Sequence, residues 1–229
     1  MNVSHQFKSM ASLIGEPVRA TVLWSLLDGK AYTATELAIV ADVSPQSISM
    51  HLNKLVKENL LTVESQGRHR YYRFSKPEVA YVIEAMANLL PADKMNGIHE
   101  STNSINGIKY CRTCYDHLAG KIGVAITEQL LKQKIILVDE KQYAITSKGT
   151  KWFMEMGISI SKLECKRRVF ARQCLDWSER RHHLAGALGA ALLTKMFDSG
   201  WIRKTKGSRA IIITSKGQTQ LYKKFKLII

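Results

Sequence analysis

The sequence lacks several features that would assign it to common classes of protein. No apolar run approaches the roughly eighteen residues needed to span a bilayer, and the most apolar stretch, LAGALGAALL, stops short of Lys195. The N-terminal MNVSHQFKSM lacks the charged-then-apolar pattern of a signal peptide. Neither a glycine-rich phosphate loop nor an HExxH motif occurs. We therefore expect a cytoplasmic protein with no membrane segment, no cofactor and no enzymatic activity.

Acidic residues are few, and their shortage is uneven. The 229 residues include 34 Lys and Arg against 19 Asp and Glu, which gives a net charge of +15. Residues 1–90 carry 9 basic and 8 acidic side chains, whereas residues 91–229 carry 25 and 11. A solubilising surface could account for any single lysine, but so large an imbalance indicates a polyanionic partner, most simply nucleic acid.

Cysteine is also scarce, and all four cysteines lie in the second half of the chain. In a cytoplasmic protein they are expected to be thiols or ligands and not structural disulfides. The hydrophobic content of 45% excludes a disordered chain and is enough for a buried core.

The first ninety residues show the order helix, helix, helix–turn–helix, hairpin, helix. Gly15 ends one apolar helical stripe, and Pro17 begins the next. Thr33 and Glu36 have the spacing of a capping box, and Ser44 with Pro45 can start the second helix of the turn. The stretch LLTVESQGRHRYYRFS alternates around Gly67 as a two-stranded hairpin would.

The helix that begins at Ser44 carries side chains suited to reading bases. Its apolar stripe faces inward and leaves Gln, Ser and Met outside, which can contact adenine, polar base edges and the thymine methyl group. The hairpin tip adds basic residues that could enter the minor groove or hold phosphates. The expected DNA contacts are Gln46, Ser47, Ser49, Met50 and Lys54 on the helix, Arg68, His69 and Arg70 at the tip, and Arg19 in an earlier helix.

Residues 8–90 resemble the ArsR/SmtB family of bacterial winged-helix repressors. The resemblance rests on EPVRATVLWSLL, on TATELAIVADVSPQSISMHLNKLVKENLL and on the hairpin TVESQGRHRYYRFS. It implies a homodimer, built from the first and last helices, that binds double-stranded operator DNA as a repressor and leaves it when an effector binds. The family's Cys-x-Cys pair and its Asp and His ligands on the last helix are missing here. Metal sensing is therefore not implied, and the longer subgroup that this chain resembles generally has no defined effector.

The second half predicts a linker followed by an internal repeat. Residues 91–108 are polar and rich in Asn, Gly and Ser, which suits a linker. HLAGKIGVAI from His117 matches HLAGALGAAL from His183, and AITSKGTKWF from Ala144 matches IITSKGQTQL from Ile212. We predict a mainly α, α+β protein: a winged helix-turn-helix domain at 1–90, then two degenerate winged-helix-like repeats at 109–158 and 159–229.

A signal could enter through the cysteines of YCRTCYDHLAG, which we expect to lie on one helix. Cys111, Cys114 and His117 would then be close in space, and Cys174 could add a fourth zinc ligand or a resolving thiol. Buried cysteines that pack as small apolar groups are the plainer alternative. His182 and His183 with Glu179 also suggest a metal site. The repeat, which matches His183 to His117, points equally to a packing or capping role at a helix start. A small molecule bound between the repeats is a further possibility.

The last repeat carries GWIRKTKGSRAIIIT, which predicts a second basic hairpin. Arg203, Lys204, Lys206 and Arg209 would project from its tip and contact phosphates outside the operator core.

The alternative from another class is an enzyme with a nucleophilic thiol, built from the clustered residues Cys114, Asp116 and His117. On one helix, however, they could not build both an oriented nucleophile and a substrate pocket, so a DNA-binding regulator is favoured.

Overall fold

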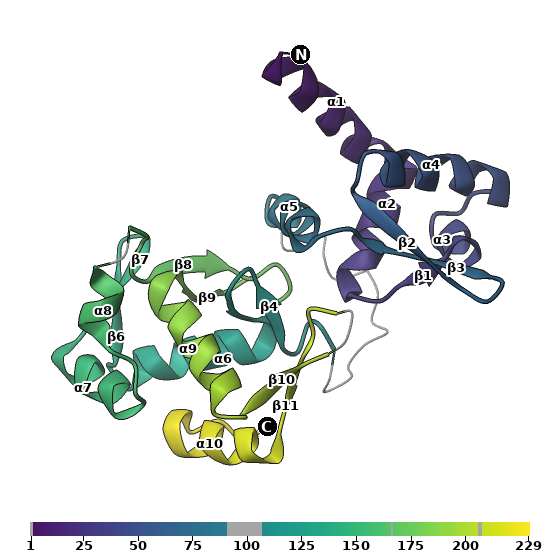
Figure 1. The fold of residues 1–229 in the computed structure, drawn as a ribbon. Coiled ribbons are helices and arrows are strands. Elements are labelled where there is room, and N and C mark those ends of the chain that lie inside the picture. The colour runs from purple at the N-terminus through teal and green to yellow at the C-terminus, as the bar shows by residue number, and fades with distance from the viewer. Residues whose placement is uncertain (1, 91–106, 166, 206–207) are drawn as a thin grey trace. The chain divides into compact units, whose positions relative to one another are not determined.

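The computed structural model describes residues 2–90, 107–165, 167–205 and 208–229. The chain divides into two compact units, Met1–Ala87 and Asn88–Ile229. Figure 1 draws the first unit in purple to blue and the second in teal to yellow. The expected linker at 91–108 lies outside the described residues except for its last two positions. Among the described residues, no helix combines the length and apolar character needed to cross a membrane.

The first unit is a winged helix-turn-helix, as the sequence predicted. A sheet with strand order β1-β3-β2 holds the wing, in which Gln66 pairs with His69 at the tip. The elements are α1 (Val3–Gly15), α2 (Pro17–Ser25), the 3-10 turn η1 (Leu26–Asp28), β1 (Tyr32–Thr33), α3 (Ala34–Val40), α4 (Pro45–Lys57), β2 (Leu61–Gln66), β3 (His69–Phe74) and α5 (Pro77–Ala87).

The helix starts of this unit follow directly from its capping residues. The Glu16 carboxylate accepts hydrogen bonds from the first free amides of α2. Thr33 and Glu36 form the complete capping box at α3, and the Ser44 hydroxyl accepts from the Ser47 amide at 3.2 Å. Each cap satisfies N–H groups that a helix leaves unpaired at its start. The Ser44 cap thereby fixes where α4 begins after the turn that follows α3.

An apolar core holds α2, α3 and α4 together beneath the wing. Leu23, Leu37, Ile48, Leu52 and Leu55 are fully buried and belong to one cluster. On α4 the buried side chains recur at positions 48, 52 and 55, which is helical spacing. The opposite face of α4 is therefore left toward solvent.

The second unit contains one order of elements twice: hairpin, helix, hairpin, helix. The first set is β4 (Arg112–Cys114), β5 (His117–Ala119), α6 (Gly120–Lys132), β6 (Ile136–Asp139), β7 (Gln142–Ile145) and α7 (Ser147–Glu155). After α8 (Ile160–Glu164), the second set is β8 (Arg172–Leu175), β9 (His182–Ala185), α9 (Gly186–Asp198), β10 (Ile202–Lys204), β11 (Ile211–Ile213) and α10 (Ser215–Phe225). The expected repeat boundary at 158/159 falls between α7 and α8.

The repeated sequence TSKG has the same structural role in both repeats. Thr146 and Thr214 cap α7 and α10 by accepting from the amides of Gly149 and Gly217. A Cβ on either glycine would lie 2.0 Å from a backbone carbonyl oxygen, that of Ile135 or Trp201. Only glycine permits this approach of a helix to the preceding hairpin, so the motif specifies both the helix start and its packing.

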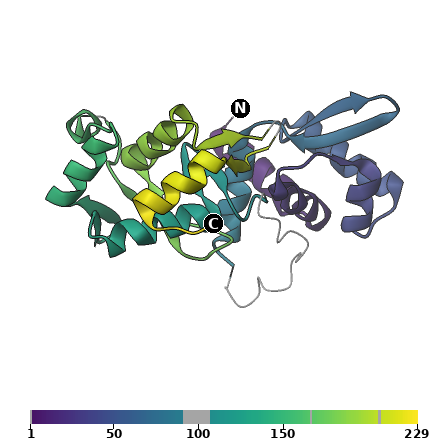
Figure 2. The ribbon, with the colours of Figure 1, turned by 90° about the horizontal axis from the view of Figure 1, so that it is seen from below.

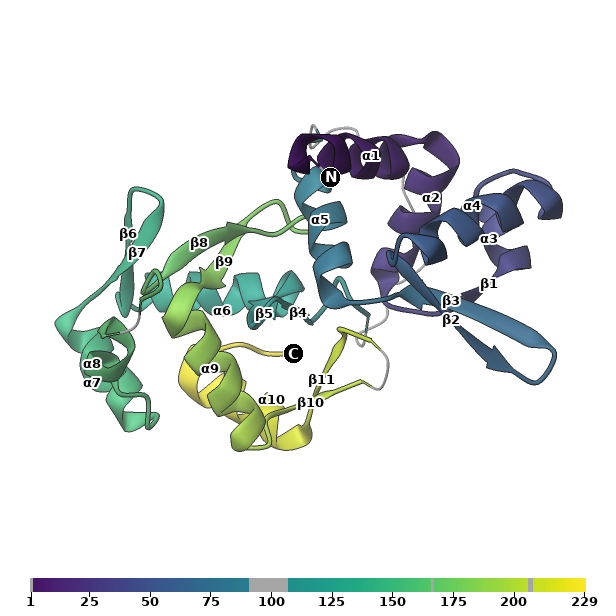
Figure 3. The same ribbon diagram turned by 45° about the horizontal axis from the view of Figure 1, so that its top comes forward.

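The two repeats exchange their first hairpins. Strand β9 packs along α6 of the first repeat, and β5 packs along α9 of the second. Figure 3 shows β8 and β9 beside α6. The Tyr143 amide donates to the Ala171 carbonyl, and the Ile211 amide donates to the Cys111 carbonyl, at 3.0 and 2.9 Å. Neither repeat therefore completes its own core, and one apolar cluster spans both.

Candidate functional site

The outward face of α4 presents the side chains expected to contact bases. Gln46, Ser49 and Lys54 are exposed, and 62% of Met50 is exposed to solvent. Ser47 is half-buried, at the helix start. These side chains stand opposite the buried stripe of α4, so their availability follows from the helical period.

The wing carries the expected basic tip. Gly67, with a φ of +60°, makes the turn between β2 and β3. Arg68, His69 and Arg70 beside it are all exposed. The wing extends beyond the helices of its own unit (Figure 2). It therefore presents positive charge on a protruding two-stranded ribbon.

Arg19 is a correction to the expected DNA contacts, because its side chain is buried. Its guanidinium donates to the backbone carbonyls of Leu13 and Ser12, at 2.5 and 3.1 Å, and lies 3.4 Å from the Glu16 carboxylate. It also lies 3.5 Å from the imidazole of His51 on α4. Arg19 thus connects α1, α2 and α4 and is not displayed toward a ligand.

A second correction concerns YCRTCYDHLAG, which is a β-hairpin and not a helix. Residues 112–114 and 117–119 pair as β4 and β5, with Cys114 directly opposite His117. Tyr115 makes the turn at a φ of +55°, a conformation that ends helices. The same pairing recurs in β8 and β9, where Cys174 stands opposite His183. His117 and His183 therefore lie on strands and do not cap helices.

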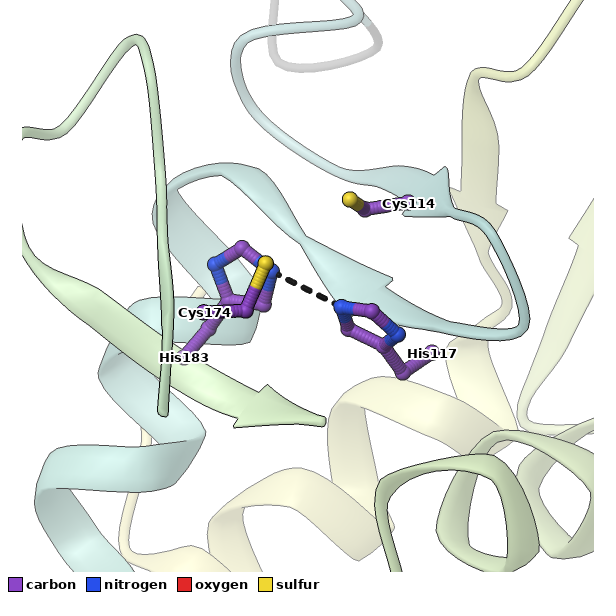
Figure 4. A group of neighbouring side chains, drawn as sticks. All are labelled: Cys114, His117, Cys174 and His183. Atoms are coloured by element: carbon purple, nitrogen blue, oxygen red, sulfur yellow. Dashed lines mark hydrogen bonds between the residues drawn. The ribbon is translucent and has the colours of Figure 1, made fainter. Parts of the chain in front are cut away.

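The two hairpins bring one cysteine–histidine pair each to a common point. The Sγ atoms of Cys114 and Cys174 and one ring nitrogen each from His117 and His183 all lie within 4.8 Å of one another. The two Nε2 atoms are 3.1 Å apart. Figure 4 shows the four side chains pointing toward one another. We call these four residues the Cys2His2 cluster.

Cys111 does not join the cluster, although the sequence grouped it with Cys114. Its side chain is fully buried in the apolar core, and burial raises the pKa of its thiol to about 12. An alternating strand places residues 111 and 114 on opposite faces, whereas a helix would have placed them together. Its packing agrees with the plainer reading of a buried cysteine as a small apolar group.

An aspartate carboxylate lies near the Nδ1 atom of each histidine, on the side of the ring away from the cluster. Nδ1 of His117 and the Asp116 carboxylate are 3.4 Å apart and form a hydrogen bond. The Asp176 carboxylate lies 3.5 Å from Nδ1 of His183, an ion-pair distance without a hydrogen bond. Asp176 is fully buried and accepts from the Arg112 guanidinium at 2.9 Å. Burial would raise the pKa of Asp176, but the charges of Arg112 and His183 and several hydrogen bonds hold it well below its usual range. The carboxylate is therefore a fixed negative charge.

The Cys114 thiol is held in its protonated form in the absence of a further charge. Its hydrogen bond with Cys174 and its burial raise its pKa to about 11, against the lowering influence of the two histidines. Such a thiol is a poor nucleophile at neutral pH. The cluster consequently does not favour thiol catalysis.

A sequence signal for the whole cluster exists in a second repeated motif. Arg112 to Asp116 reads RTCYD, and Arg172 to Asp176 reads RQCLD. Each R-x-C-x-D precedes a copy of HLAG, directly in the first repeat and after the insertion WSERRH in the second. The paired motifs identify His183 as the missing member.

The basic hairpin expected near the C-terminus corresponds to β10 and β11. Arg203 and Lys204 are exposed on β10, while Arg209 is half-buried. The ammonium group of Lys204 also lies 5.6 Å from the ring centroid of Phe197. Lys206 lies outside the described residues. At least two of the four expected basic side chains are therefore displayed.

Comparison with known proteins identifies the class of this chain. Residues 14–64 match the family model of a helix-turn-helix domain. The chain is 44% identical over 209 residues to a Bacillus subtilis protein named as the uncharacterized HTH-type transcriptional regulator YdfF. That match covers 91% of this chain and 92% of YdfF.

Solved structures of winged-helix regulators resemble about two fifths of the chain. One is the homodimeric winged helix-turn-helix DNA-binding domain of Mb0332 from Mycobacterium bovis, a possible ArsR-family regulator. It is 18% identical and covers 44% of this chain and 90% of that one, with a TM-score of 0.36. The repressor BigR from Xylella fastidiosa is 16% identical and covers 39% and 90%, also with a TM-score of 0.36. The full-length similarity to YdfF and the domain match establish that this chain belongs to the helix-turn-helix transcriptional regulators, as the ArsR/SmtB resemblance of its first ninety residues predicted.

Proposed function

We propose that this regulator is a homodimeric repressor that reads a specific double-stranded operator in the cytoplasm and is released by an effector. The observation that carries the proposal is the two-sided character of α4. Its inner stripe of Ile48, Leu52 and Leu55 is fully buried, while Gln46 and Met50 on the other side are open to solvent. A helix fixed in this manner presents rigid base-reading groups to the major groove.

The chemistry of the exposed face supports sequence-specific reading. Gln46 can pair with the N6 and N7 edge of adenine, and Met50 can contact a thymine methyl group. Lys54, farther along α4, can neutralise a phosphate. The wing residues Arg68 and Arg70 add charge at a distance from α4, where they would position the duplex without reading its sequence.

Unpartnered apolar side chains on α1 and α5 support the homodimer. Phe7 and Val3 on α1 are 73% and 78% exposed, and Val82 and Met86 on α5 are 47% and 44% exposed. Their helical spacing makes a stripe on each helix, and a second copy of the chain could bury both stripes. These are the first and last helices of the domain, which the family resemblance assigns to the dimer interface.

The effector of the proposed release is expected to act through the second unit. Sensing through the pair Cys111 and Cys114 loses support, because Cys111 lies in the core and away from Cys114. A thiol- or zinc-responsive variant would have to use the Cys2His2 cluster. A small molecule bound between the repeats remains the other candidate.

Binding to the DNA upstream of the protein's own gene tests the proposal. Fluorescence anisotropy with this duplex and with a scrambled duplex gives the specificity ratio at fixed salt. Gln46→Ala should lower the specificity ratio about 5- to 150-fold, which corresponds to a loss of about 1–3 kcal/mol of discrimination. Gln218→Ala, an exposed glutamine on α10, is the matched control and should leave the ratio unchanged. Equal binding of the wild-type protein to both duplexes would contradict the proposal.

A further inference from the structure

We propose that Cys114, His117, Cys174 and His183 bind one Zn²⁺ ion in a closed tetrahedral site that fastens the two C-terminal repeats together. The site lies in the second unit, so it is independent of the DNA-binding surface of the first. It differs from the ligand sets that the family resemblance implies, which lie on helices of the winged-helix domain.

The donor atoms have the spacing that zinc requires. Zinc bonds of about 2.0–2.1 Å to nitrogen and about 2.3 Å to sulfur place neighbouring donors about 3.3–3.8 Å apart in a tetrahedron. The two histidine Nε2 atoms are 3.1 Å apart, and all four donors lie within 4.8 Å of one another. Small side-chain rotations therefore suffice to close the site around an ion.

The two imidazoles are oriented so that both Nε2 atoms can bind one ion. Each ring has Nδ1 within 3.5 Å of an aspartate oxygen, from Asp116 or Asp176. If both Nδ1 atoms carry their proton toward these carboxylates, both Nε2 lone pairs point at each other. With no ion bound, one Nε2 keeps a proton and donates to the other at 3.1 Å (Figure 4). An ion that replaces this proton would accept the lone pairs of both rings. A carboxylate behind each ligating histidine is also the usual support of a zinc site.

The charges around the cluster balance when zinc is bound. Zn²⁺ with two cysteine thiolates is neutral. The aspartates behind the histidines each have an arginine, because Arg112 donates to Asp176 at 2.9 Å and Arg168 donates to Asp116 at 2.6 Å. No net charge is buried by the complete site, which is the condition for a stable buried ionic group.

The repeat architecture explains why the site needs both halves of the unit. Each hairpin supplies one cysteine and the histidine opposite it, so each is half of a ligand set. Each hairpin also lies close to the long helix of the other repeat, because a Cβ at Gly189 on α9 would lie 3.2 Å from the Cβ of His117. Four protein ligands leave no open position for a substrate, so the ion would be structural and not catalytic.

Metal content of the full-length protein tests this inference. The protein is purified under reducing conditions, loaded with Zn²⁺ and dialysed, and its metal is measured by mass spectrometry. One zinc per chain is expected, and Cys174→Ser and His183→Gln should each retain less than half as much. Cys165→Ser removes an exposed cysteine and should keep the full amount.

Cobalt provides a readout on the unaltered chain, which remains decisive if a ligand variant fails to fold. Co²⁺ added to the reduced, metal-free wild-type protein should give the intense visible bands of a tetrahedral site and a thiolate charge-transfer band. A folded wild-type protein that binds neither ion stoichiometrically would overturn the inference. Unchanged zinc retention in Cys174→Ser would do the same. Failure of DNA binding in a zinc-loaded protein would count only against the proposed function.

Discussion

Arg112 and Asp176, from the first hairpins of the two different repeats, meet in a fully buried ion pair, with guanidinium and carboxylate 2.9 Å apart. Asp176 also accepts from the Gly120 amide at 2.7 Å. The pair therefore connects the hairpin of one repeat to the hairpin and helix start of the other. It lies directly behind the Cys2His2 cluster.

Removal of Arg112 should destabilise the second unit strongly. Arg112→Ala leaves the Asp176 carboxylate buried without its counter-ion, which typically costs about 3–5 kcal/mol. Urea denaturation followed by tryptophan fluorescence measures the loss. Arg73→Ala removes an exposed arginine 3.7 Å from Glu64 and should cost under about 1 kcal/mol. Equal effects of the two changes would show that the buried pair has no special role.

The glycine of the first TSKG should resist even the smallest substitution. Gly149→Ala places a Cβ 2.0 Å from the Ile135 carbonyl oxygen, so α7 must move, at a cost of about 1–3 kcal/mol or more. Gly15→Ala meets nothing within 4 Å and should be neutral or slightly stabilising, because alanine favours a helix. Thermal unfolding of both variants decides the matter, and tolerance of Gly149→Ala would refute the close approach.

The C-terminal hairpin should contribute to DNA affinity but not to sequence preference. Replacement of Arg203 and Lys204 with Ala should reduce the slope of log affinity against log salt by up to about 2, because each phosphate contact contributes about 0.9. The control is Lys216→Ala with Lys223→Ala, which removes two exposed lysines from α10. Identical slopes for the two double variants would exclude this hairpin from the interface.

The capping box of α3 should make a small, pH-dependent contribution to stability. Hydrogen bonds from the Thr33 amide and hydroxyl hold the pKa of Glu36 below its ordinary value of 4.5. The folded state thus favours the ionised form, so the contribution is complete above pH 4.5 and is lost as the pH falls through the lowered pKa. Because Glu36 is exposed, we expect less than about 1 kcal/mol. The stability difference between wild type and Glu36→Gln should shrink on acidification, and a constant difference would contradict the assignment.

Local signals predicted the first unit well because its elements depend on neighbours in sequence. Thr33 and Ser44 each cap the helix that follows them directly, and Gly67 permits the turn of the wing. Arg19 was misplaced because its burial depends on carbonyl groups of α1 and on His51, contacts that no periodicity reveals.

The second unit was harder to predict because its key contacts are distant in sequence. Short strands such as Arg112–Cys114 cannot show alternation, and a C-x-x-C spacing fits one face of a helix equally well. His183 reaches the cluster only because the repeats exchange hairpins. The duplicated R-x-C-x-D motif indicates that the two hairpins are equivalent. Only the packing of the repeats shows that their cysteines and histidines meet in one cluster.

The spacing of protected bases on the operator tests the central claim most directly. Hydroxyl-radical footprinting with the full-length protein should show two protected segments of similar sequence, centred about one helical turn, or about 10 base pairs, apart. Gln46→Ala should weaken both segments together, since each comes from one α4 of the dimer. A single protected segment at every protein concentration, or uniform protection without sequence preference, would contradict a dimer that reads successive major grooves.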